Sequence, residues 1–190
     1  MNPLSPVIRL CLFAIAWFSW MLAFAVRRKG GQQAVQMEPK ARWGILLEMA
    51  GFFCVFMHRP RMHIWDSELA VWRALLGVVF AIPAILMAWS AVGHLGRQWR
   101  IDAGLNADHE LVQTGAYRVV RHPIYASMLG MLLASICWVG TLPGWPLGVV
   151  LFVVGTEIRV RVEDGLLLAR FGQRFSEWRL SVPAYLPFLR

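Results

Sequence analysis

Two stretches of the 190-residue sequence bring together polar side chains of the kinds that bind ligands, residues 96–125 and residues 157–164. In the second stretch, EIRVRVED, Arg159 and Glu163 lie four positions apart and would share one face of a helix. A guanidinium binds carboxylates, and a carboxylate binds ammonium groups. A surface ion pair is the alternative, but charged groups entering an apolar helix are costly and usually mark a functional site. We therefore expect Arg159 and Glu163 to line a binding site.

The first stretch ends in RHPIY at residues 121–125. Pro123 suits the first turn of a helix, where its missing N–H costs nothing, so His122 should lie at the positive end of that helix. Such a helix start, with its free N–H groups, suits a carboxylate-bearing ligand. Tyr117 follows a flexible TGA segment and can bring a second aromatic ring to stack on a heterocycle. Alternatively, His122 and Tyr125 only anchor the helix at a membrane interface.

The composition indicates a membrane protein. The chain is 58% hydrophobic and 16% charged, with a mean hydropathy of +0.53, and apolar surplus on this scale normally faces lipid. The net charge of +8 does not indicate a nucleic-acid partner, because the basic residues are dispersed between apolar runs. Cys11, Cys54 and Cys137 each lie in an apolar run without metal-ligand spacing, so we expect neither a disulfide framework nor a metal site.

Apolar runs predict about five transmembrane helices, at residues 7–26, 43–57, 74–92, 124–142 and from 145 onward. The first run could be a cleavable signal peptide, but its basic cluster follows the apolar residues and it has no A-x-A site. The last run, residues 145–156, is too short to cross a bilayer alone. We expect it to follow a tight turn at residues 141–146 and to continue as one long helix that leaves the membrane.

Glu48 lies inside the second of these apolar runs. An ionisable residue within a membrane span suggests a functional site. It could equally form a structural ion pair with Arg73 or with another partner. The sequence leaves its role open.

Basic residues predict the orientation of the helices, because cytoplasmic loops are rich in Lys and Arg. The loops after the first, third and fifth runs hold Arg27, Arg28, Lys29, Lys40, Arg42, Arg97, Arg100, Arg118, Arg121, Arg159, Arg161, Arg170, Arg174, Arg179 and Arg190, against Arg9, Arg59, Arg61 and Arg73 on the other side. The N-terminus should therefore lie outside, and the C-terminus and residues 96–125 in the cytoplasm. A preference for Arg over Lys is typical of a GC-rich genome and indicates a prokaryotic inner membrane.

Four segments carry a resemblance to one known family: LGRQW at residues 95–99, HELVQTGAYRVVRHPIYAS at 109–127, RVRVED at 159–164 and FGQRFSEWRLSVPAYLP at 171–187. With them, about half of the chain resembles the isoprenylcysteine carboxyl methyltransferase family of integral membrane enzymes, which includes membrane phospholipid methyltransferases. The chain departs from the family pattern at Asp164, where a second Glu is common, and at Phe175 and Trp178, where Tyr is common. These departures affect the acidic pair and the choice of substrate.

The resemblance implies an all-α membrane fold with a cytoplasmic cofactor pocket, formed by the loop before the fourth helix and the C-terminal helices. It implies S-adenosylmethionine as cofactor, and no GxGxxG segment argues for a soluble nucleotide-binding sheet instead. By resemblance, Arg159 binds substrate, Arg159 and Glu163 are catalytic, and the cofactor-binding residues are His109, Glu110, Leu111, Val112, Tyr117, His122, Pro123, Ile124, Tyr125 and Glu163. Residues 1–190 would form one membrane domain, with 1–92 lacking a signature and 93–190 forming the catalytic region.

The implied reaction is methyl transfer to a lipophilic or lipidated acceptor from the membrane, with an isoprenylcysteine-type carboxylate most like the family. A phospholipid amine or a thiol is the alternative acceptor. A carboxylate is already ionised at pH 7 and needs no general base, whereas an amine would require one, such as Glu163 or His122. A sterol-type membrane reductase using NADPH and a non-catalytic membrane scaffold are the two other classes.

Overall fold

The computed structural model describes residues 6–26, 36–57, 69–99, 103–140 and 144–186. Within them the chain forms α1 (Pro6–Val26), α2 (Ala41–Met57), α3 (Leu69–Leu95), α4 (Pro123–Trp138), α5 (Gly144–Phe171) and α6 (Gln173–Ser181), with 3-10 turns η2 (Gly96–Gln98) and η3 (Gly115–Arg118). Two short strands, β1 (Gln36–Met37) and β2 (Gly104–Leu105), pair antiparallel, which the sequence did not predict. The helical fold class is confirmed.

Each predicted apolar run lies within an observed helix except at one end, and α3 extends beyond the predicted run 74–92 at both ends, from Leu69 to Leu95. α5 continues without a break from the apolar run to Phe171, which confirms the long fifth helix. α4, however, ends at Trp138 and not at residue 142. The N–H of Gly140 donates to the carbonyls of Ser135 at 3.0 Å and Ile136 at 3.1 Å, which closes the helix although the sequence stays apolar. The start of the turn at 141–146 lies outside the described residues, as do Arg27, Arg28, Lys29, Arg59, Arg61, Arg100 and Arg190.

Within the described part of the chain, two helices are long and apolar enough to span a membrane, Val7–Val26 and Val71–Leu95. α4 is a shorter apolar helix, and the total of five spans stays a prediction. Large apolar side chains cover outward faces, among them Phe18 on α1, Leu86 on α3 and Val150 on α5, all of them exposed. Surfaces of this kind are expected to face lipid.

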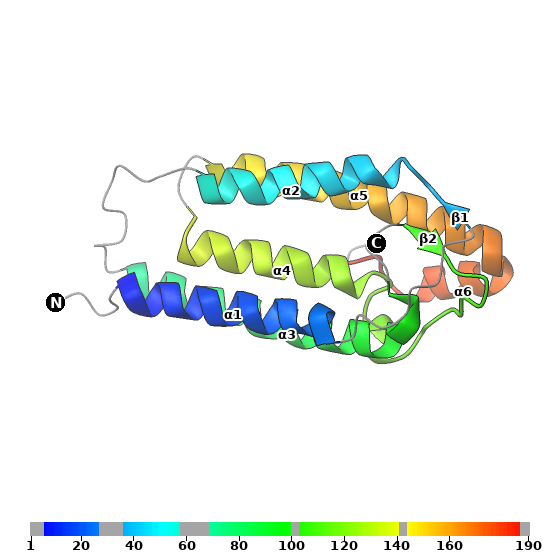
Figure 1. Ribbon diagram of the computed structural model, residues 1–190, viewed down its shortest axis with the longest axis horizontal. Coiled ribbons are helices and arrows are strands. Elements are labelled where there is room, and N and C mark those ends of the chain that lie inside the picture. The colour runs from blue at the N-terminus through cyan, green and yellow to red at the C-terminus, as the bar shows by residue number, and fades with distance from the viewer. Residues whose placement is uncertain (1–5, 27–35, 58–68, 100–102, 141–143, 187–190) are drawn as a thin grey trace.

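The helices form layers in which α4 is central (Figure 1). α2 lies along α5 on one side of α4, and α1 and α3 lie on the other side. α4 contributes to two cores, with Leu132 beside Val55 and Phe152 in one and Met131 beside Ala81 in the other. The strand pair, α6 and the end of α3 gather at one end of the helices, opposite the start of α1 (Figure 1).

Glycines allow α2 and α5 to approach closely. A Cβ on Gly44 would lie 2.6 Å from the carbonyl oxygen of Gly155, and a Cβ on Gly155 would lie 2.6 Å from that of Gly44. Contacts of this length leave no room for a side chain, as is common where small residues join membrane helices. The close approach places Glu48 of α2 against Arg159 of α5.

Candidate active site

A cavity of about 130 Å³ lies at the end of the helices that carries the strand pair. It is lined by the end of α3, β2, the loop that follows it, η3, the start of α4 and the second half of α5. The structure brings together eight of the sequence-predicted site residues there: His109, Tyr117, His122, Pro123, Ile124, Tyr125, Arg159 and Glu163. Two segments about 40 residues apart in the chain thus meet at one cavity, as the motifs require.

Three predicted residues do not line this cavity. Glu110 is exposed, and its N–H donates to the Oε1 of Gln98 at 2.9 Å. Leu111 is buried and Val112 packs beside it, in the core cluster that contains Phe175 and Trp178. Their predicted contribution to cofactor binding stays a prediction, and in this structure they anchor the loop that carries His109.

Tyr117 reaches the cavity through a turn that needs glycine. Gly115 has a φ of +60°, and the ring of His94 occupies the place where its Cβ would stand. The N–H of Ala116 donates to the Oγ of Ser90 at 3.0 Å, which ties the turn to α3. Burial raises the pKa of Tyr117, so the phenol is neutral and presents a flat aromatic wall.

α4 begins at Pro123, as predicted, but the N–H groups before it are not free. The N–H of Arg121 donates to the carbonyl of Pro183, and that of His122 to the carbonyl of Ala184, both at 2.8 Å. The C-terminal segment therefore occupies these donors. An anion could therefore bind here only through the first-turn N–H groups of Ile124 and Tyr125, which have no acceptor within the helix.

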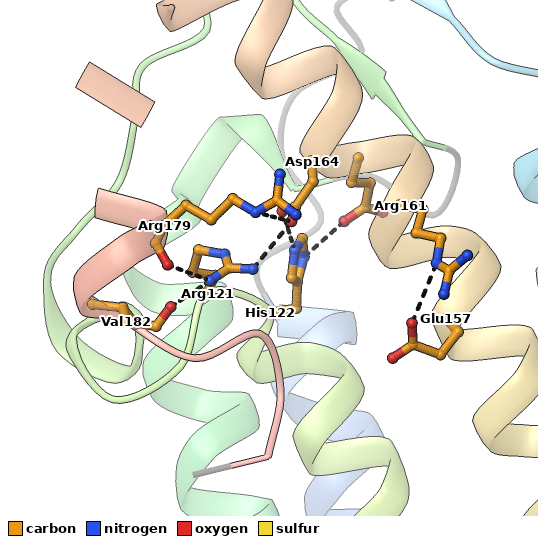
Figure 2. A network of polar contacts seen from close by, with 8 residues as sticks. Arg121, His122, Glu157, Arg161, Asp164, Arg179 and Val182 are labelled. Carbon is orange, nitrogen blue, oxygen red and sulfur yellow. Dashed lines mark hydrogen bonds and ion pairs between the residues drawn. The ribbon is translucent and has the colours of Figure 1, made fainter. Parts of the chain in front are cut away.

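The consecutive carboxylates Glu163 and Asp164 have different surroundings. Asp164 accepts hydrogen bonds from Nη2 of Arg121 at 3.1 Å and Nε2 of His122 at 2.9 Å, and Nε of Arg179 lies 3.7 Å away (Figure 2). Glu163 faces Nδ1 of His122 at 3.2 Å and accepts a hydrogen bond from the Tyr125 hydroxyl. Only Glu163 of the pair lines the cavity, so Glu163 is the carboxylate that a ligand can reach.

The contacts of His122 favour its imidazolium form. Its two ring nitrogens both face carboxylates, which accept hydrogen bonds and do not donate them when ionised. Burial alone would lower the pKa of His122, but its hydrogen bonds with Asp164 and Glu163 raise that pKa above its ordinary value. Burial alone would raise the pKa of Asp164, but His122 and Arg121 hold it below its ordinary value.

Arg159 contacts Glu48 and Tyr125 within the described part of the chain. Its Nη1 donates to Oε2 of Glu48 at 2.8 Å, and its guanidinium carbon lies 4.7 Å from the centre of the Tyr125 ring. The hydroxyl of Thr156 donates to the other Glu48 oxygen at 3.1 Å. Arg73 donates instead to two carbonyls at the C-terminal end of α4, so pairing of Glu48 with Arg73 is not observed.

Sequence reasoning did not single out Gln98, Leu105, Leu166 and Leu167, which line the cavity. It noted Glu48 as an ionisable residue in an apolar run but did not find its contact with Arg159. Gln98 lies within the LGRQW segment, which was a usable signal. Leu166 and Leu167 follow Glu163 by about one helical turn, so helical spacing could have found them. Leu105 reaches the cavity through the short strand pair, for which the sequence holds no signal.

Residues 75–169 match the model of the "Isoprenylcysteine carboxyl methyltransferase (ICMT) family". The matched segment contains all the described residues that line the cavity, and it excludes Glu48. It covers half of the chain, from within α3 to nearly the end of α5.

Curated proteins and solved structures similar to the chain include the following. It is 29% identical over 132 residues to a protein-S-isoprenylcysteine O-methyltransferase of Tribolium castaneum, covering 66% of this chain and 43% of that protein. It is 28% identical over 139 residues to protein-S-isoprenylcysteine O-methyltransferase B of Arabidopsis thaliana, covering 71% of this chain and 66% of that protein. The chain thus spans less than two thirds of either relative.

The structure of the eukaryotic intramembrane Ras methyltransferase ICMT, without a monobody, has the same fold with a TM-score of 0.69. The similarity covers 98% of this chain and 69% of that one at 18% sequence identity. It therefore extends to α1 and α2, which lie outside the segment matched by the family model. By its matched segment and its fold, the chain belongs to the isoprenylcysteine carboxyl methyltransferase family.

Proposed function

We propose that the chain is an integral membrane methyltransferase that transfers the methyl group of S-adenosylmethionine to the carboxylate of a lipophilic, isoprenylcysteine-type acceptor. One observation carries the proposal: Arg159 and Glu163, one turn apart on α5, line the same cavity. They offer a cationic and an anionic contact side by side. Family membership and the names of the relatives support methyl transfer as the reaction.

The residues of the cavity fit S-adenosylmethionine, which supplies an electrophilic methyl group on its sulfonium when bound. Glu163 would hold the ammonium group, and the first-turn N–H groups of Ile124 and Tyr125 would hold the carboxylate. Tyr117 and His109 offer aromatic surfaces for adenine. The Nδ1 of His109 is buried and makes no hydrogen bond within the described chain, which leaves it for a ligand. Burial lowers the pKa of His109, so its ring is neutral at pH 7.

The acceptor side of the site rests on Arg159. An acceptor carboxylate is ionised at pH 7, so the guanidinium has only to hold one oxygen toward the methyl group. No general base is needed for this reaction. An amine acceptor would need one, and His122 is unsuited because both of its nitrogens already face carboxylates. Glu163, the other candidate base, holds the ammonium group of the cofactor in this proposal, so a carboxylate acceptor fits the site better than an amine.

We further propose that α1 to α5 span a prokaryotic inner membrane with the N-terminus outside and the site on the cytoplasmic side. The start of α2, the end of α3 and the end of α5 meet at the site end of the molecule. Arg42, Arg118 and Arg170 lie in these elements or beside them, whereas Arg9 and Arg73 lie near the opposite helix ends. This distribution supports the orientation given by the positive-inside rule.

Methyl-labelled S-adenosylmethionine tests the function with the full chain in nanodiscs. We expect base-labile label, typical of a methyl ester, on N-acetyl-S-farnesylcysteine and none on phosphatidylethanolamine or on a lipophilic thiol. Label on phosphatidylethanolamine or on the thiol would overturn the proposal that the acceptor is a carboxylate. Calorimetry with the cofactor alone separates the other classes: binding of NADPH instead of S-adenosylmethionine would indicate a reductase, and binding of neither a scaffold.

A further inference from the structure

The second helix carries a buried carboxylate beside the cavity. Glu48 is 2% exposed and lies between Gly44 and Gly51, the two glycines of α2 that meet α5. It receives two hydrogen bonds from α5, one from Thr156 and one from Arg159. Glu48 itself does not line the cavity, whereas Arg159 does.

Stability alone does not explain this pair. Removing a carboxylate and a guanidinium from water is costly, and well-packed apolar residues often stabilise a fold as well or better. An apolar pair at these positions would also suit the surrounding helices, in which Val55 and Phe152 are fully buried. The pair therefore calls for a function at Arg159.

The contacts show what Glu48 does to Arg159. An arginine side chain has several rotatable bonds, and holding it in one geometry costs rotamer entropy. Glu48 accepts a hydrogen bond from Nη1, and the guanidinium carbon lies over the Tyr125 ring. Resting on the proposed function, we propose that Glu48 is a positioning residue that holds Arg159 toward the acceptor carboxylate, so that α2 forms part of the acceptor site.

Glu48 could act on acceptor binding through the position of its oxygen or through its charge, and these two roles predict opposite effects of substitutions. An acceptor carboxylate that shares Arg159 with Glu48 is repelled by the charge of Glu48. The charge therefore does not help an anionic acceptor to bind, and the benefit comes from where the Glu48 oxygen stands. Glu48→Asp keeps the charge and withdraws the oxygen by one methylene, whereas Glu48→Gln removes the charge and keeps an oxygen that accepts from Nη1.

We expect Glu48→Asp to raise the KM for N-acetyl-S-farnesylcysteine about tenfold or more, because a shift near 1 Å at a positioning group has effects of this size. Glu48→Gln should leave that KM at or below the wild-type value. Both variants should bind S-adenosylmethionine within about twofold of wild type, since Glu163 is untouched. Glu177 is an exposed carboxylate on α6, and Glu177→Gln serves as the control. It should change neither the acceptor KM nor the affinity for S-adenosylmethionine.

Acceptor affinity is also measured without turnover, as the Kd for N-acetyl-S-farnesylcysteine in the presence of S-adenosylhomocysteine. The positioning role would be overturned if Glu48→Asp and Glu48→Gln raised the acceptor KM and Kd by the same factor. It would also be overturned if Glu48→Asp raised neither quantity. Absence of methyl transfer by the wild type would instead overturn the proposed function, and the inference with it. If Glu48→Asp does not fold, Thr156→Val removes the second hydrogen bond of Glu48 and should raise the acceptor KM two- to threefold; an unchanged KM then overturns the inference.

Discussion

His122 donates a hydrogen bond through Nε2 to Asp164 at 2.9 Å, and this contact divides a consecutive acidic pair into two tasks. Asp164 is turned away from the cavity and joins His122 to Arg121, whose guanidinium also donates to the carbonyl of Arg179 at 3.1 Å. Glu163 is left as the carboxylate that faces the ligand. The shorter side chain at position 164 is thus placed where it connects α5 to the start of α4 and to the C-terminal segment.

This division predicts different losses for the two carboxylates. Asp164→Asn leaves buried cations without their partner, so we expect a loss of about 3 kcal/mol of folding free energy. Glu163→Gln should lower stability by less than about 1 kcal/mol but weaken S-adenosylmethionine binding about tenfold or more, since a charge-assisted contact is lost. Thermal unfolding and calorimetry on the same preparations check both. Equal effects of the two variants on cofactor affinity and stability would contradict the division.

The protonation of His122 predicts a pH dependence of stability. Its folded-state pKa is raised, so its contribution is fully present below the unfolded value of about 6.5 and is lost as pH rises through the folded value. The pKa of Asp164 is lowered, so its contribution is present above its unfolded value of about 3.9 and is lost as pH falls through the folded one. Stability from this network should therefore be greatest between about pH 4 and pH 6.5.

Unfolding midpoints measured from pH 6 to pH 9 check this dependence. We expect the wild-type midpoint to fall as the pH rises above 6.5 and the fall to be much smaller in His122→Gln, which cannot titrate. A midpoint that rises with pH in the wild type, or the same slope in both proteins, would show that His122 is not an imidazolium in the folded state.

Local signals predicted the start of α4 and the length of α5, because Pro123 fixes a helix start and the helical pattern of α5 persists beyond its apolar run. The end of α4 was misplaced, since hydrophobicity continues past Gly140 while backbone hydrogen bonds end the helix. Motif resemblance found most of the cavity. It could not find the Glu48–Arg159 contact, which joins residues 111 positions apart and depends on how closely α2 approaches α5.

Arg159→Lys tests whether the guanidinium binds the acceptor. A lysine keeps the charge but cannot bind Glu48 and an acceptor carboxylate with two separate edges, so we expect the acceptor KM to rise about tenfold or more with little change in cofactor affinity. Arg161→Lys is a matched control two residues along α5, where the side chain is 82% exposed and pairs only loosely with Glu157. A shift of the same size in both variants would show that the effect comes from losing any guanidinium on α5, and not from a contact between Arg159 and the acceptor.

Gly155→Ala tests whether the approach of α2 and α5 is needed for the site. The added methyl would lie 2.6 Å from the carbonyl oxygen of Gly44 and 2.9 Å from the backbone nitrogen of Glu48, so the helices must separate. We expect a loss of about 1–3 kcal/mol of stability from overpacking, together with a higher acceptor KM because Glu48 moves away from Arg159. Gly165→Ala on the same helix meets no atom within 4 Å and should be neutral or stabilising. Since both changes add one methyl group to α5, equal unfolding midpoints and equal KM values for the two variants would mean that close helix contact does not position Arg159.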